Sequence, residues 1–280
     1  MTAIRNRQEV RELQKMKLFL TSSPAGNYFT SDGKRAASKL DESNSFVEEL
    51  KQCWKGDARC LMISAAPDEY DMNDSICEIF AQALPMSGLS VSEMVVWDHR
   101  NTKQDEDFLE QFDMILLSGG HVPTQNAFFR EIELRDRIQD YDGIVIGISA
   151  GTMNCADLVY AMPELEGEAL DQNYRRFILG LGLTDVMVIP HYQYLKDVML
   201  DGMKMIEDIG YADSMGRSFF ALPDGSYIKV TDDKTVDYGE AFLIQDGKLT
   251  KICEKNECLD ISNEEDIEKY VLLKRCKDAQ

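Results

Sequence analysis

The segment with the clearest chemical potential is Gly147–Gly151, which reads Gly-Ile-Ser-Ala-Gly. It follows an apolar run at residues 143–148, which predicts a buried strand, and a helical pattern begins at Ala150. Small residues let the chain turn tightly between strand and helix, so that the serine hydroxyl stands exposed beside a helix N-terminus that favours negative charge. We therefore predict that Ser149 is a nucleophile. The alternative is a glycine-rich turn with a buried serine.

A serine nucleophile needs a neighbouring base, and the sequence has three histidines, His99, His121 and His191. Each follows a predicted strand. His191 comes after Ser149 and directly follows the predicted strand 185–189 and Pro190. We predict that His191 is the base.

Two further roles have candidates. The backbone N–H groups of Ala150 and of the Gly119-Gly120 turn could stabilise an oxyanion, with Gly120 as the second donor. Asp224 could orient His191, although Pro-Asp-Gly at this position also specifies a turn by itself. Competitors for the orienting acid are Glu164 and Glu166.

The order of these residues along the chain is informative. Ser149, His191 and Asp224 follow the order serine, histidine, acid, whereas α/β-hydrolases have serine, acid, histidine. The α/β-hydrolase order would need Asp171 or Asp185 as the acid, which crowds acid and base into a short stretch. The order therefore disfavours that fold.

The elements that must position these residues alternate between short apolar runs and helical patterns. Strands are predicted at 17–22, 59–65, 91–97, 114–117 and 143–148, and helices at 45–54, 75–84, 125–139 and from 150. This alternation predicts a mostly parallel sheet flanked by helices, with functional loops at the carboxyl ends of the strands. Beyond residue 165 we expect the strand 185–189, a helix over 195–209 ended by Gly210, hairpins at 218–222/226–230 and 241–244/248–252, and a charged helix over 264–280. We predict one α/β domain over residues 1–280.

Composition excludes several classes of function. The 280 residues carry 30 Lys and Arg against 50 Asp and Glu, a net charge of −20, which disfavours binding to nucleic acid or to an anionic membrane surface. The seven cysteines form no Cys-x-x-Cys pair, so we predict reduced thiols, no metal site and a cytoplasmic location. The sequence has no run of about 18 apolar residues, so we predict no membrane-spanning helix.

Five motifs in order resemble the serine peptidases that include dipeptidase E (α-aspartyl dipeptidase) and cyanophycinase. The resemblance runs from about Ile115 to Val230, and earlier residues match only in the order of strands and helices. The motifs are Leu117-Ser118-Gly119-Gly120, Gly147–Gly151 with Asn154 shortly after, Met162-Pro163, Pro190-His191-Tyr192 and Leu222-Pro223-Asp224-Gly225.

The resemblance implies a fold like that of class I glutamine amidotransferases, no cofactor, and Ser149, His191 and Asp224 as the catalytic residues. This sequence departs from the dipeptidases at two positions, with Asp224 in place of Glu and His121 in place of Asn. The family also implies an N-terminal aspartate in the substrate, whose carboxylate suits a bidentate arginine. Expected substrate-binding residues are Gly119, His121, Arg175, Arg176 and Tyr192, with Arg100 and Arg130 as further arginine candidates.

We therefore expect a serine exopeptidase that acts on short peptides, with Asp-Xaa dipeptides as the first candidates. Three alternatives stay open: a cyanophycinase-like hydrolase of β-linked aspartyl-arginine, an esterase of α/β-hydrolase type, and a binding protein without turnover. The expected partner is a small peptide, and a homodimer stays open.

Overall fold

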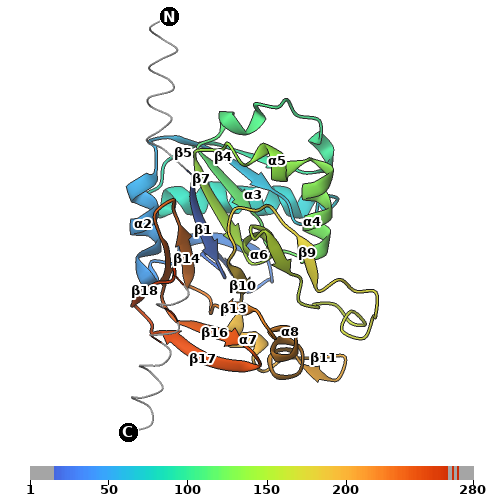
Figure 1. Ribbon diagram of the computed structural model, residues 1–280. Coiled ribbons are helices and arrows are strands. Elements are labelled where there is room, and N and C mark those ends of the chain that lie inside the picture. Colours follow the sequence, from blue (N-terminus) through green and yellow to red (C-terminus); the bar gives the residue numbers. More distant parts are fainter. Residues whose placement is uncertain (1–15, 264–266, 268–269, 271–280) are drawn as a thin grey trace, which may run out of the picture.

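The computed structural model describes residues 16–263, 267 and 270. The predicted helix over 264–280 therefore lies, apart from Ile267 and Tyr270, outside the described residues. The described chain forms an eight-stranded sheet flanked by helices and a second sheet of four strands (Figure 1).

The larger sheet has the strand order β18-β15-β14-β1-β7-β6-β4-β5 within the described residues. The strands are β1 (Lys17–Thr21), β4 (Ala58–Ile63), β5 (Val91–Trp97), β6 (Met114–Leu117), β7 (Ile144–Ile148), β14 (Tyr227–Val230), β15 (Thr235–Tyr238) and β18 (Cys258–Asp260). The five predicted strands pair in parallel, and β14, β15 and β18 extend the sheet in antiparallel pairing. The prediction of a mostly parallel sheet is confirmed.

Helices cover both faces of this sheet, because the parallel strands are apolar on both sides. On β1, Phe19 belongs to one core cluster, whereas Leu18 and Leu20 belong to the other. The Phe19 side is covered by α2 (Phe46–Cys53) and α3 (Tyr70–Met86). The opposite side is covered by α4 (Val122–Glu131) and α5 (Leu134–Arg137).

Two of these helices differ from their predicted bounds. Helix α3 begins at Tyr70, five residues before the predicted start. The predicted helix 125–139 is divided into α4 and α5, because Glu133 takes a positive φ of 54° and ends the regular helix there. Short helical turns lie at η1 (Ser43–Ser45), η2 (His99–Asn101) and η3 (Phe108–Gln111), and α6 is Ala150–Asn154.

The second sheet has the order β10-β13-β16-β17 and lies below the first in Figure 1. Its strands are β10 (Met187–Ile189), β13 (Ser218–Ala221), β16 (Ala241–Gln245) and β17 (Lys248–Cys253). The predicted hairpin around Asp246-Gly247 is confirmed as β16–β17, and both turn residues have the positive φ that such tight turns require.

The other predicted hairpin is wrong. Strand β13 pairs with β10 and β16, whereas β14 pairs with β1 and β15 in the larger sheet. Pro223-Asp224-Gly225 therefore carries the chain from one sheet to the other. The reason lies in packing, since Phe219 and Ala221 join the core cluster under the second sheet and Tyr227 joins the cluster around Phe19.

The predicted helix over 195–209 is also wrong. After the short helix α7 (Tyr192–Leu195), the chain forms a hairpin of β11 (Met199–Leu200) and β12 (Met203–Lys204) around Asp201-Gly202. Both turn residues have positive φ, so the Asp-Gly signal outweighs the helical spacing of the apolar residues. One turn of π-helix (Met205–Gly210) and α8 (Tyr211–Asp213) follow.

Two further antiparallel pairs outside the two sheets were not predicted. Strands β2 (Ala25–Phe29) and β3 (Arg35–Leu40) form a hairpin through Asp32-Gly33. Strands β8 (Leu158–Tyr160) and β9 (Phe177–Leu179) pair across a long connection that contains Arg175 and Arg176.

Asp237 on β15 gives the first testable prediction. Its side chain is fully buried, neither carboxylate oxygen makes a hydrogen bond of regular geometry among the described residues, and the weakly donating thiol of Cys253 lies beside it. Burial raises the pKa of Asp237 to about 8. The folded state therefore holds a proton that the unfolded chain releases near pH 4, so this group's contribution to stability falls as the pH rises towards 8.

The variant Asp237→Asn removes this titration. We expect the free energy of unfolding of the variant minus that of the wild type to be roughly 3 kcal/mol larger at pH 8 than at pH 5. Urea unfolding of both proteins at the two pH values measures the difference, and equal differences at pH 5 and pH 8 would contradict a buried, protonated Asp237.

Candidate active site

Ser149 lies at a sharp turn between β7 and α6, with φ 51° and ψ −111°, a backbone conformation that residues with a side chain rarely adopt. A Cβ on Gly147 would stand 2.7 Å from the backbone of Thr152, and one on Gly151 would stand 2.1 Å from the carbonyl oxygen of Leu117. Glycine is therefore required on both sides of the turn. The predicted strand–serine–helix turn is present.

The structure brings Ser149, His191 and Asp224 together. The Nε2 atom of His191 lies 2.9 Å from the Oγ of Ser149, and its Nδ1 lies 2.7 Å from the Oδ1 of Asp224. Ser149 follows β7, His191 follows β10 and Asp224 follows β13, so three carboxyl ends of strands supply the group. The crossing between the two sheets brings the short aspartate side chain within reach of the imidazole.

The charge on Asp224 decides which way these hydrogen bonds run. Burial raises the pKa of Asp224, but hydrogen bonds from His191 and Ser22 outweigh it and hold that pKa below its usual value. The carboxylate is ionised at neutral pH and only accepts hydrogen bonds. The Nδ1 of His191 must therefore donate, which leaves the Nε2 lone pair of the neutral ring free to accept the hydroxyl proton of Ser149.

Ser22 is a member of this group that sequence reasoning missed. It is fully buried at the carboxyl end of β1, and its Oγ donates to the Oδ1 of Asp224 over 2.7 Å. The same oxygen accepts the backbone N–H of His191 over 2.7 Å. One hydroxyl thus holds both acid and imidazole, and its place at a strand end was the only sequence signal.

The turn that follows β6 lies directly against the nucleophile. A Cβ on Gly119 would stand 3.4 Å from the Cβ of Ser149, and one on Gly120 would stand 2.7 Å from the Cβ of Ala65. Ala150 is the first residue of α6, so its N–H has no partner within the helix. Gly119 thus lies against Ser149 and Gly120 lies against Ala65, and the assignment of the Gly120 and Ala150 N–H groups as oxyanion donors stays a prediction.

Buried amide side chains hold this turn in place. Gln125 donates to the carbonyl oxygen of Ser118 over 2.7 Å, and Asn154 donates to the Oε1 of Gln125 over 3.0 Å. Asn126 donates to the Oδ1 of Asn154 over 3.0 Å. The three amides connect α4 to α6 behind the Gly119-Gly120 turn, and of them only Asn154 stood in a motif singled out from the sequence.

The other acids and histidines lie elsewhere. Glu164 and Glu166 are exposed, and the carboxylate that meets His191 is that of Asp224. His99 contacts Asp68 at 2.7 Å and Glu131 at 3.2 Å. His121 contacts Glu168 and Thr124, each through one ring nitrogen.

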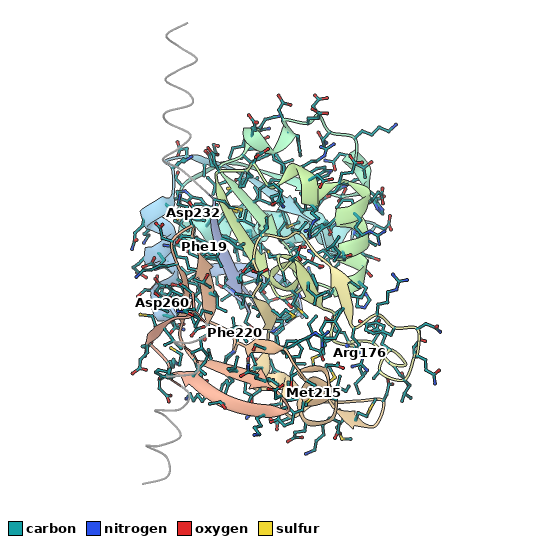
Figure 2. All side chains as sticks on the ribbon, viewed as in Figure 1. Phe19, Arg176, Met215, Phe220, Asp232 and Asp260 are labelled. Carbon is teal, nitrogen blue, oxygen red and sulfur yellow. The ribbon has the colours of Figure 1, made fainter. Side chains whose placement is uncertain are left out.

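Two of the arginines considered for substrate binding are engaged in ion pairs. Arg176 lies 2.8 Å from Asp213, which also accepts a hydrogen bond from the hydroxyl of Tyr160. Figure 2 labels Arg176 in the lower right part of the molecule, away from Phe19 in the larger sheet. Arg100 pairs with Asp74 and Asp98.

The remaining candidates differ in exposure. Arg175 and Arg130 are exposed. Tyr192 is buried, and its ring packs against Phe242 with centroids 4.5 Å apart, so its side chain belongs to the core beneath His191. Burial thus separates Tyr192 from the surface at which a substrate would arrive.

The described residues contain no group of three or more His, Cys, Asp or Glu side chains that could hold a metal ion. In the same part of the chain, no helix is both long and apolar enough to cross a bilayer.

Solved structures with the same fold include two peptidases. A peptidase from an acI-B1 Actinobacterium superposes with a TM-score of 0.58 at 16% identity, covering 89% of this chain and 98% of that chain. A putative peptidase E protein from Listeria monocytogenes EGD-e superposes with a TM-score of 0.52 at 16% identity, covering 80% and 98%. The shared arrangement is consistent with the class I glutamine amidotransferase-like fold.

No protein of curated function matches this sequence significantly. The sequence profile of peptidase family S51, in contrast, matches residues 32–237, which include the strand ends that carry Ser149, His191 and Asp224. The chain therefore belongs to peptidase family S51, the serine peptidase family of dipeptidase E and cyanophycinase.

Proposed function

We propose that this protein is a serine exopeptidase that hydrolyses short peptides through an acyl-enzyme on Ser149. The observation that carries the proposal is the continuous hydrogen-bonded line from Ser149 through His191 to Asp224, with contacts of 2.9 and 2.7 Å. A serine beside a neutral imidazole that an ionised acid orients is the arrangement that acyl transfer needs.

In the proposed mechanism, the Nε2 of His191 removes the hydroxyl proton while the Oγ of Ser149 attacks the scissile carbonyl carbon. The N–H groups of Gly120 and Ala150 stabilise the negative charge on the carbonyl oxygen. His191 then gives its proton to the leaving amine, and the peptide bond breaks. Water, deprotonated by the same imidazole, hydrolyses the ester on Ser149 and restores the hydroxyl.

For the substrate we propose Asp-Xaa dipeptides. An aspartyl carboxylate needs a guanidinium that is not already paired, and Arg176 and Arg100 are held in ion pairs. Arg175 is exposed and lies next to Arg176 in the connection between β8 and β9. Arg130 is also exposed, but Arg175 lies in the connection whose Met162 packs in the same cluster as Ala150, so we favour Arg175 as the residue that binds the substrate carboxylate.

A dipeptide panel of Asp-Xaa, Glu-Xaa, Ala-Xaa and β-Asp-Arg tests this proposal. We expect turnover of Asp-Xaa that falls about 10⁴-fold or more in Ser149→Ala, because the nucleophile is lost while the fold remains. Ser92→Ala, on the exposed face of β5, is the matched control. Turnover that survives Ser149→Ala would contradict the nucleophile, and hydrolysis of β-Asp-Arg alone would contradict the α-linked substrate.

Asp224→Asn tests the orientation of the imidazole. The amide group of asparagine can donate to Nδ1, which favours the tautomer whose Nε2 carries a proton and no longer accepts from Ser149. We expect kcat to fall about 10³–10⁴-fold with a small change in thermal stability. If Asp224→Asn retained full activity while Glu164→Gln lost it, the acid would be Glu164.

Ser22→Ala tests the shared hydroxyl. The variant leaves the backbone N–H of His191 without its acceptor and removes one hydrogen bond from Asp224. We expect kcat to fall about tenfold while KM stays close to that of the wild type, since Ser22 is buried and has no access to substrate. Steady-state kinetics separate the two constants. A rise in KM at constant kcat would show that Ser22 acts on binding.

A further inference from the structure

The long connection between β8 and β9, residues 161–176, is here termed the bridge segment. It begins in the core, where Met162 packs in the same cluster as Ala150, the residue after the nucleophile, and Tyr192, the residue after the base. It then runs over the surface, where Leu165 and Leu170 expose 55% and 66% of their area. A segment without regular structure keeps one conformation only through the contacts that hold it.

One carboxylate provides the contact with the nucleophile side of the site. The Oε1 of Glu168 lies 2.9 Å from the Nε2 of His121. Its Oε2 accepts the backbone N–H groups of Glu164 over 2.8 Å and of Leu165 over 3.0 Å. Glu168 therefore shapes the exposed turn of the bridge segment and joins it to His121, which directly follows the Gly119-Gly120 turn.

Hydrogen bonding determines the charge of Glu168. Burial raises the pKa of Glu168, but hydrogen bonds from the two backbone N–H groups and His121 outweigh it and leave the pKa below its usual value. The ionised Glu168 only accepts, so Nε2 of His121 donates and the hydroxyl of Thr124 lies 2.8 Å from Nδ1. Both side chains are largely covered, with 23% and 16% exposed, which strengthens the contact.

A second carboxylate attaches the bridge segment to the chain that follows the base. Asp201, in the turn of the β11–β12 hairpin, accepts the backbone N–H groups of Gly167 over 2.8 Å and of Ala169 over 3.1 Å. That hairpin follows α7, which begins immediately after His191. The bridge segment is thus attached both to the residue after the Gly119-Gly120 turn and to the hairpin that follows the base.

We propose that His121, acting through Glu168, is a positioning residue that holds the bridge segment beside the place where the peptide binds and thereby sets substrate affinity. The proposal rests on the proposed peptidase function. His121 makes no contact in the Ser149–His191–Asp224 line, and Gln125 holds the turn before it independently. Loss of the His121–Glu168 contact should therefore weaken substrate binding more than it slows the chemical step.

Kinetics of His121→Ala, Glu168→Ala and the double variant test the proposal. We expect KM to rise about tenfold in His121→Ala, with kcat within about threefold of the wild type, because one charge-assisted hydrogen bond is lost. Glu168→Ala also removes the acceptor of the Glu164 and Leu165 N–H groups, so KM should rise at least as much, and the double variant should be no worse than Glu168→Ala alone. Glu168→Gln keeps a hydrogen-bonding group and should restore most of the affinity.

A second measurement needs no turnover. Arg175 is an exposed residue of the bridge segment, so the rate of trypsin cleavage after it reports how often the segment is released. We expect cleavage there to be about tenfold faster in His121→Ala and Glu168→Ala, with unchanged labelling of Ser149 by a fluorophosphonate. The matched control is His99→Ala, which breaks the contacts with Asp68 and Glu131 outside the bridge segment and should change neither readout.

The outcomes are distinguishable. Unchanged KM with unchanged trypsin cleavage would overturn the proposal, as would a fall in kcat at constant KM, which would mean that His121 acts on the Gly119-Gly120 turn. If the wild type hydrolyses no peptide, the proposed function and the affinity claim fail together. The trypsin rates still decide whether the His121–Glu168 contact holds the bridge segment.

Discussion

The hydrogen bond between His191 and Asp224 depends on one feature of chain topology, the crossing from the second sheet to the larger sheet at Pro223-Asp224-Gly225. Strand β13 is held beside β10, which places the crossing next to the residue that follows β10. Strand β14 is held beside β1, which brings Ser22 to the same place.

Most of the catalytic group is built from positions where the backbone is constrained. Ser149 and His191 both have positive φ, which is costly for residues with side chains and persists only where surrounding contacts require it. At Ser149 the close approaches of Gly147 and Gly151 to Thr152 and Leu117 supply that requirement. At His191 the backbone N–H bonded to Ser22 has the same effect. The side chains are therefore oriented before a substrate binds, which lowers the cost of reaching the reactive geometry.

The protein has a large negative net charge, but the carboxylates around the site each accept hydrogen bonds from specific donors. Asp224 is satisfied by His191 and Ser22, Glu168 by His121 and two backbone N–H groups, and Asp201 by two more. The hydrogen bonds hold the pKa values of Asp224 and Glu168 below their usual values, so these two carboxylates stay ionised without being left unpaired in a partly buried place. The acidic composition thus contributes hydrogen-bond acceptors that shape the loops around Ser149.

Local sequence was sufficient for the features that depend on neighbours along the chain. Apolar runs marked the five parallel strands, small residues marked the turn at Ser149, and Asp-Gly marked the β16–β17 hairpin. Local sequence was insufficient wherever the structure depends on contacts between segments that lie far apart in the chain. The assignment of β13 and β14 to different sheets, the choice of Asp224 over Glu164 and Glu166, and the contacts of Ser22 and Glu168 all join residues far apart in sequence. Hydrophobic spacing shows that a side chain must be buried but carries no information about its partner, so only the packed tertiary structure decided which groups meet at the site.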